Sequence, residues 1–160
     1  MAALRIGTSS WKYDSWEGLV YQAGSKESYL EQYARRYETV EIDQWFWRMP
    51  EPATAAEYCR SVPETFRFTL KVPNLITLTH PYVKRNGDPL EPNPDFLSRE
   101  LYAQFLEAVR PLSGRIGALI FQFEYLNRQK MPSQARFLEL LESFFSELPA
   151  GGPPFVVEPR

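Results

Sequence analysis

The chain has 160 residues, 44% hydrophobic and 24% charged, which predicts one globular domain and excludes a disordered, collagen-like or coiled-coil protein. Its 18 Lys and Arg oppose 20 Asp and Glu, so the net charge of −2 indicates neither nucleic-acid binding nor adsorption to a membrane. A single cysteine, Cys59, excludes an intramolecular disulfide. Because no secretory leader and no apolar run of about 18 residues is seen, we expect a soluble cytoplasmic protein.

The hydrophobic pattern of the first half predicts two strands, each followed by a helix. An apolar run over 4–8 predicts a buried strand, and a loop rich in Trp, Tyr and Gly follows it over 9–24. Apolar residues spaced three and four apart predict an amphipathic helix over 26–36. A second strand is expected over 39–43, and flanking prolines delimit a second helix over 52–62.

The second half repeats this pattern. Residues 66–72 alternate between apolar and polar side chains, which predicts a strand. Four prolines predict a long loop over 80–95, and the next helix is expected to begin at Pro94 or Asp95.

The last part of the chain predicts two more strands. A continuous apolar run predicts a strand over 116–123, Ser133 is expected to cap the helix that follows, and a last strand begins at Phe155. Alternating strands and helices predict right-handed βαβ units and a parallel sheet of about five strands with four helices.

One face of the predicted strands is apolar and the other is polar or charged. In the strand over 66–72, Phe, Leu and Val side chains lie opposite Thr69 and Lys71, and the strand over 39–43 divides in the same way. A doubly wound sheet is apolar on both faces, whereas strands that curve around a lumen have helices on the outside only. We therefore predict an α/β fold that is part of a (β/α) TIM-like barrel.

Charged groups gather at the expected carboxyl ends of the strands, where barrel enzymes bind their substrates. The predicted catalytic residues are Glu41, Asp43, Lys71 and Glu158. Neighbouring carboxylates raise one another's pKa and a nearby ammonium lowers it, so one acid can be protonated while another is ionised. A structural network of ion pairs in the lumen is the alternative interpretation.

Six further residues are expected to bind a ligand: Trp11, Trp47, Arg48, His80, Gln122 and Arg160. The tryptophans would stack on a ring-shaped ligand or simply pack over the barrel mouth, and the arginines would bind an anionic group. His80, the only histidine, is either a general acid or base or an ordinary loop residue. No spacing indicates a metal site, so no metal ligand is predicted and any cofactor is unknown.

Four stretches of the chain resemble a known family. They are IGTSSW at 6–11, TVEID to FWRMP at 39–50, FRFTLKVP at 66–73 and FQ at 121–122. In order and spacing they resemble the DUF72 (YecE-like) proteins, which have a TIM-barrel-like fold and no established activity. The resemblance implies a polar pocket at the strand carboxyl ends, and the matching residues are Trp11, Glu41, Arg48, Lys71, His80, Gln122 and Glu158.

The chain departs from this family pattern at several positions. The family usually has Asn where Asp43 stands and Tyr where Trp47 stands, so we expect a more negative pocket with a bulkier wall. Residues 122–125 read Gln-Phe-Glu-Tyr instead of Gln-Leu-Pro-Pro, and 158–160 read Glu-Pro-Arg instead of Glu-Phe-Arg.

Length is the largest departure from the family. Its members run to about 250 residues, a usual size for eight βα units. We therefore expect 1–160 to be a single incomplete barrel domain that lacks the C-terminal strands and helices, unless two copies complete each other.

The expected function is that of an enzyme acting on a small polar or phosphorylated compound, by hydrolysis or by lyase or isomerase chemistry. Lys71 and Glu41 would stabilise charge and move protons, complemented by Glu158 and Asp43. The first alternative is a barrel that binds a ligand or partner without catalysis, and the second is metal-assisted phosphodiester hydrolysis. The common nucleotide-binding, zinc-protease and serine-hydrolase motifs do not occur in the sequence.

Overall fold

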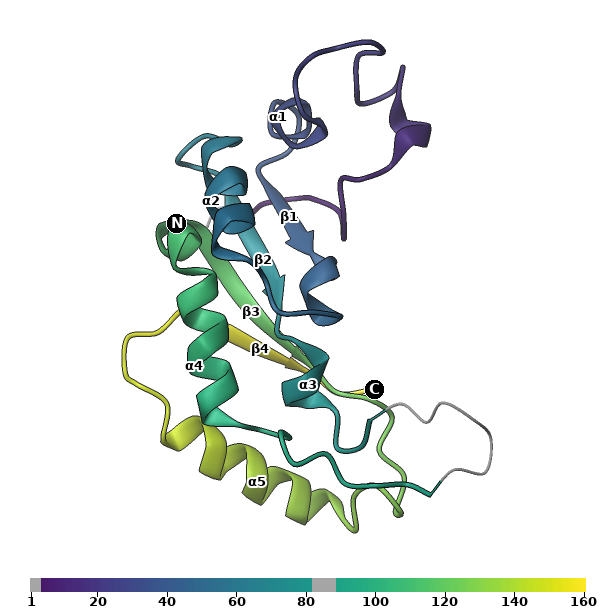
Figure 1. Cartoon of the computed structure of the whole chain (residues 1–160), viewed down its shortest axis with the longest axis vertical. Helices are drawn as coiled ribbons and strands as arrows, with labels where there is room; N and C mark the ends of the chain where they lie inside the picture. Colours follow the sequence, from purple (N-terminus) through teal and green to yellow (C-terminus); the bar gives the residue numbers. More distant parts are fainter. Residues whose placement is uncertain (1–3, 82–88) are drawn as a thin grey trace.

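The computed structural model describes residues 4–81 and 89–160 and shows an α/β fold with one parallel sheet (Figure 1). The strands follow one another in the sheet in chain order: β1 (Thr39–Ile42), β2 (Arg67–Lys71), β3 (Ile116–Gln122) and β4 (Phe155–Glu158). The helices are α1 (Tyr29–Tyr33), α2 (Pro52–Arg60), α3 (Asn74–Thr77), α4 (Arg99–Ala108) and α5 (Gln134–Ser146). Short 3-10 helices occupy Asp14–Trp16, Asp43–Phe46 and Arg110–Arg115. None of the described helices is long and apolar enough to cross a membrane.

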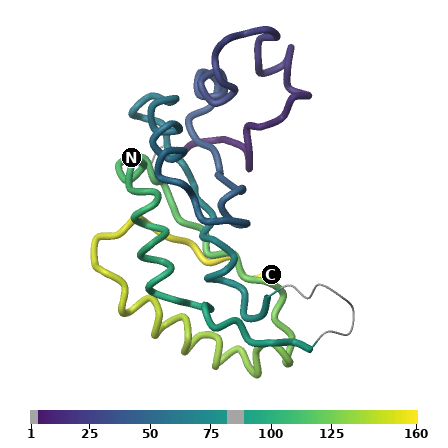
Figure 2. Tube along the Cα trace, in the orientation of Figure 1, coloured from purple at the N-terminus to yellow at the C-terminus, as the bar shows by residue number. Residues whose placement is uncertain are grey.

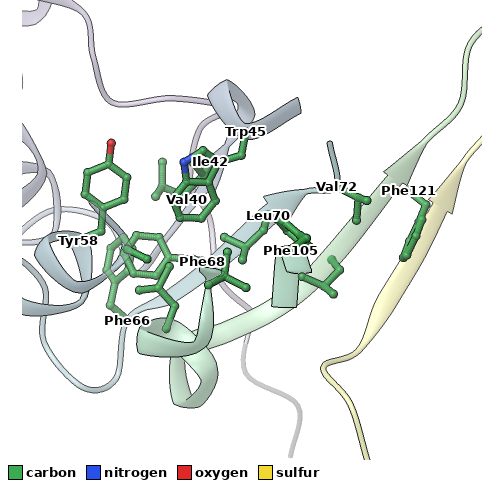
Figure 3. Close-up of a cluster of buried hydrophobic side chains, with 14 of the residues drawn as sticks. Val40, Ile42, Trp45, Tyr58, Phe66, Phe68, Leu70, Val72, Phe105 and Phe121 are labelled. Carbon is green, nitrogen blue, oxygen red and sulfur yellow. The ribbon is translucent and has the colours of Figure 1, made fainter. Parts of the chain in front are cut away.

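Helices pack against one face of the sheet, which we call the covered face. Phe68, Leu70 and Phe121 on this face are fully buried. The ring of Phe121 lies 5.6 Å from that of Tyr102 in α4 and 5.8 Å from that of Phe144 in α5. Figure 3 shows this apolar cluster along the strands. Burying each such side chain contributes about 1.5–3 kcal/mol, so the covered face holds the helices on the sheet.

Polar side chains lie mainly on the opposite face, which we call the open face, where Ile120 and Val156 are apolar exceptions. Register partners in a parallel sheet point to the same side: Glu41 pairs with Thr69, and Gln122 pairs with Glu158. Burial alternates along β1, with Val40 and Ile42 buried and their neighbours partly exposed. The predicted division into an apolar and a polar face is confirmed.

The predicted buried strand over 4–8 is wrong, and the sheet has four strands in the described residues instead of about five. The segment runs at the β1 edge of the sheet, purple in Figure 2, where the backbone N–H of Glu41 donates to the carbonyl oxygen of Thr8 (2.9 Å). Leu4 is 85% exposed and Ile6 is 69% exposed. The apolar run over 4–8 predicted burial, but the side chains of Leu4 and Ile6 are largely uncovered by the described residues.

Local capping explains where three helices begin. Ser28 and Glu31 form a capping box that starts α1 later than predicted. Ser98 caps α4 one turn later than expected, because the positive φ of Leu97 (56°) cannot continue a helix. The predicted cap of α5 is confirmed, since the Ser133 hydroxyl accepts a backbone N–H of the first turn (3.1 Å).

Candidate functional site

The carboxyl ends of β1 and β2 bring three of the four predicted catalytic residues together. Lys71 ends β2, and its Nζ lies 3.2 Å from Oε1 of Glu41 in β1 and 2.6 Å from Oδ1 of Asp43, which follows β1. Lys71 is 9% exposed, and its ammonium lies 5.8 Å from the ring centre of Phe46. We call Glu41, Asp43 and Lys71 the lysine cluster.

The pKa of Lys71 follows from opposing effects. Burial lowers this pKa, but the hydrogen bond to Asp43 and the charge of Glu41 raise it more, so it lies above its ordinary value. Lys71 is therefore a fixed positive charge at neutral pH. Two carboxylates share this one ammonium, which leaves the lysine cluster with spare acceptor oxygens for hydroxyl groups.

The fourth predicted catalytic residue lies in a separate cluster at the ends of β3 and β4. Arg160 donates from Nε to Oε1 of Glu158 (3.1 Å) and from Nη2 to Oε1 of Gln122 (3.0 Å). Gln122 is buried and Arg160 is exposed. Within residues 4–81 and 89–160, Lys71 pairs with the two carboxylates of its own cluster and not with Glu158.

A third polar cluster lies just beyond the ends of β2 and β3, and the sequence pattern predicted only one of its members. Glu124 accepts hydrogen bonds from the backbone N–H (3.1 Å) and the hydroxyl (2.8 Å) of Thr79 and pairs with Lys130. Nδ1 of His80 lies 3.0 Å from the same Thr79 hydroxyl oxygen. We call these residues the histidine cluster. Two sequence signals pointed to Glu124, its position at the carboxyl end of the strand over 116–123 and the departure from the family pattern, but it was not among the predicted site residues.

The remaining predicted ligand-binding residues are Trp11, Trp47 and Arg48. Trp11 is 4% exposed and packs edge-on against Tyr58, with ring centres 5.0 Å apart, as a loop-packing residue would. Trp47 is 63% exposed. Arg48 lines a cavity of about 530 Å³ together with Lys12, Trp11 and Tyr58.

Residues 5–160 match the family described as "Protein of unknown function DUF72". The chain belongs to this family. It is 26% identical over 142 residues to the UPF0759 protein YecE of Escherichia coli K12, a match that covers 88% of the chain and 45% of YecE. YecE of Escherichia coli O157:H7 matches equally. The resemblance to DUF72 proteins is thereby confirmed.

Solved DUF72 structures share the fold. A protein from Enterococcus faecalis V583 is 25% identical with a TM-score of 0.58, covering 96% of this chain and 49% of that one. A protein from Thermotoga maritima MSB8 is 21% identical with a TM-score of 0.62, covering 98% of this chain and 55% of that one. The chain thus spans about half the length of its DUF72 relatives. Its fold is a partial TIM-barrel-like α/β fold, and the family description assigns no activity.

Proposed function

We propose that the carboxyl edge of the sheet binds a small polar compound and transfers a proton on it. The observation that carries this proposal is the buried ammonium of Lys71, held between Glu41 and Asp43 on the open face. Burying charges costs desolvation free energy, and buried ion pairs contribute little net stability. Their location at the strand carboxyl ends, and not in the apolar core, supports a functional role.

The charges favour a neutral, hydroxyl-rich substrate over a phosphorylated one. Each cation of the three clusters is already paired with a carboxylate: Lys71 with two, Arg160 with Glu158 and Lys130 with Glu124. In this proposal the Lys71 ammonium stabilises negative charge that develops on a substrate oxygen, while Glu41 or Asp43 binds a hydroxyl group and moves its proton.

We also propose that the open face is the wall of a barrel lumen. The polar side chains on this face and the match to about half of each solved DUF72 structure support this arrangement. Two copies of the chain could complete such a barrel, as the sequence analysis considers, and light scattering on the purified chain tests this form of the arrangement: a folded 18.7 kDa monomer would contradict it.

The alternatives differ in what happens to the ligand. A binding protein would release it unchanged, using the same residues. For metal-assisted hydrolysis, the described residues hold no group of three His, Cys, Asp or Glu side chains arranged around a metal position, so no observation favours that alternative. The proposed location is cytoplasmic, and the single cysteine, Cys59, is compatible with a reducing compartment.

Thermal-shift measurements test the proposed function. We expect a neutral sugar or polyol, tested as glucose, ribose and myo-inositol, to raise the melting temperature more than inorganic phosphate or AMP does. The gain should disappear in Lys71→Met and persist in Lys26→Met, a matched control because Lys26 is exposed. Mass analysis of the recovered compound then distinguishes catalysis from binding. Stabilisation that survives Lys71→Met would contradict the proposal.

A further inference from the structure

The histidine cluster fixes where the protons lie. An ionised carboxylate only accepts hydrogen bonds, so the Thr79 hydroxyl must donate its single proton to Oε1 of Glu124 (2.8 Å). Towards His80, the Thr79 oxygen can then only accept. The proton in the 3.0 Å contact between Thr79 and His80 therefore belongs to Nδ1 of the imidazole.

This assignment leaves Nε2 as the basic atom of the neutral ring. A neutral imidazole carries one ring proton, so Nε2 holds a free lone pair when Nδ1 is protonated. Among the described residues, none forms a hydrogen bond with Nε2. His80 is 8% exposed, and Nε2 is not among the fully buried polar atoms that lack a partner in the described residues, so this unpaired nitrogen is the accessible atom of the ring.

The cluster belongs to the functional edge of the sheet. His80 follows α3, which lies at the carboxyl ends of the strands in Figure 1. Glu124 comes two residues after β3 ends, and its side chain is 8% exposed. Its ion pair with Lys130 holds the carboxylate in place.

We propose that His80 is a second proton acceptor at this edge, beside the carboxylates of the lysine cluster, with Nε2 as the reacting atom and with Thr79 and Glu124 as positioning residues. The inference rests on the proposed function, because it assumes that the substrate binds here. A substrate O–H bond breaks, its electron pair stays on oxygen and the proton forms an N–H bond at Nε2. The resulting imidazolium is stabilised through Thr79 by the Glu124 carboxylate, and the proton returns to the substrate or its leaving group.

The tautomer can be measured without knowing the substrate. Because His80 is the only histidine, its ring signals in a ¹⁵N-labelled protein need no further assignment. In the neutral ring we expect a protonated Nδ1 and a bare Nε2. Thr79→Ser should keep this state, and Thr79→Val should shift the ring towards the Nε2–H form.

Thr77→Val is the matched control for this measurement. The Thr77 hydroxyl is buried without a hydrogen-bond partner among the described residues, so its removal should leave the His80 tautomer unchanged. An Nε2–H form in the unmodified chain, or a tautomer that Thr79→Val does not alter, would overturn the inference. Should Thr79→Val fail to fold, the unmodified chain and Thr79→Ser decide the question.

Acylation by diethyl pyrocarbonate tests whether Nε2 can be reached. This reagent attacks an unprotonated ring nitrogen, so we expect one adduct on Nε2 of His80 and none in His80→Gln. Absence of the adduct would overturn the proposal, since a substrate could not reach the base either. Lys71→Met should change neither the tautomer nor the acylation, so a failure here is distinct from a failure of the proposed function.

Discussion

The two faces of the sheet place opposite chemistry on adjacent residues. Leu70 on the covered face is fully buried among aromatic rings, while its neighbour Lys71 on the open face carries a charge held by two carboxylates. The alternation of side chains along a strand is sufficient to separate them. The comparison indicates that burial on the covered face stabilises the fold, whereas the open face carries the charged residues to which we assign the proposed function.

The largest expected effect comes from the covered face. Phe121→Ala should lower the free energy of unfolding by about 3–5 kcal/mol, because it leaves a cavity among the rings of Tyr102 and Phe144. Val156→Ala, at a 49% exposed position on the open face, should cost less than about 1 kcal/mol. Urea unfolding measures both, and equal losses would contradict the division of labour between the faces.

A smaller loss is expected in the lysine cluster. Lys71→Met should cost about 1–3 kcal/mol, because Glu41 and Asp43 then face each other without the ammonium. Their side chains are 23% and 42% exposed, so water compensates part of the loss. Adding Asp43→Asn should recover some of the stability, which a double-mutant cycle measures. A loss as large as that of Phe121→Ala would make the cluster primarily structural.

The sequence predicted which face of the sheet each strand residue occupies better than it predicted the edge of the sheet and the contacts between loops. The period of two over 66–72 identified the side of β2 that helices cover, and the same rule brought Glu41 and Lys71 together across neighbouring strands. The segment over 4–8 was predicted wrongly because an apolar run does not reveal whether anything covers it. The contact between Thr79 and Glu124 joins residues 45 positions apart in loops, where no periodicity operates.

Alkaline pH should lower the free energy of unfolding through groups on both faces. Burial raises the pKa of Tyr102, on the covered side, to about 12, and the pKa of Lys71 on the open face is also raised. A raised pKa in the folded state gives stability that is complete below the ordinary value of about 10 and is lost as the pH rises through the folded value. The free energy of unfolding should therefore fall between pH 10 and about 12.

Tyr102→Phe isolates the contribution of Tyr102 to this alkaline loss. The variant removes an ionisable group from the covered side while keeping the ring, so stability should fall less steeply above pH 10. Urea unfolding at a series of pH values gives the slope, and ultraviolet absorbance of tyrosinate reports the ionisation itself. An unchanged slope in Tyr102→Phe would show that other groups with a raised pKa, such as Lys71 and Tyr21, dominate the alkaline loss.

The smallest expected effect lies in α5, which packs on the covered face alone in the contacts described above. Ser133→Ala removes the hydroxyl that accepts a backbone N–H of the first turn, and it should cost about 1 kcal/mol, whereas Ser133→Asp keeps the cap. Urea unfolding measures this loss. Because the cap stabilises the helix and does not touch the open face, the His80 tautomer should stay the same in both variants. A tautomer that changed with Ser133→Ala would show that the two faces are energetically coupled and that the helices also position the polar edge.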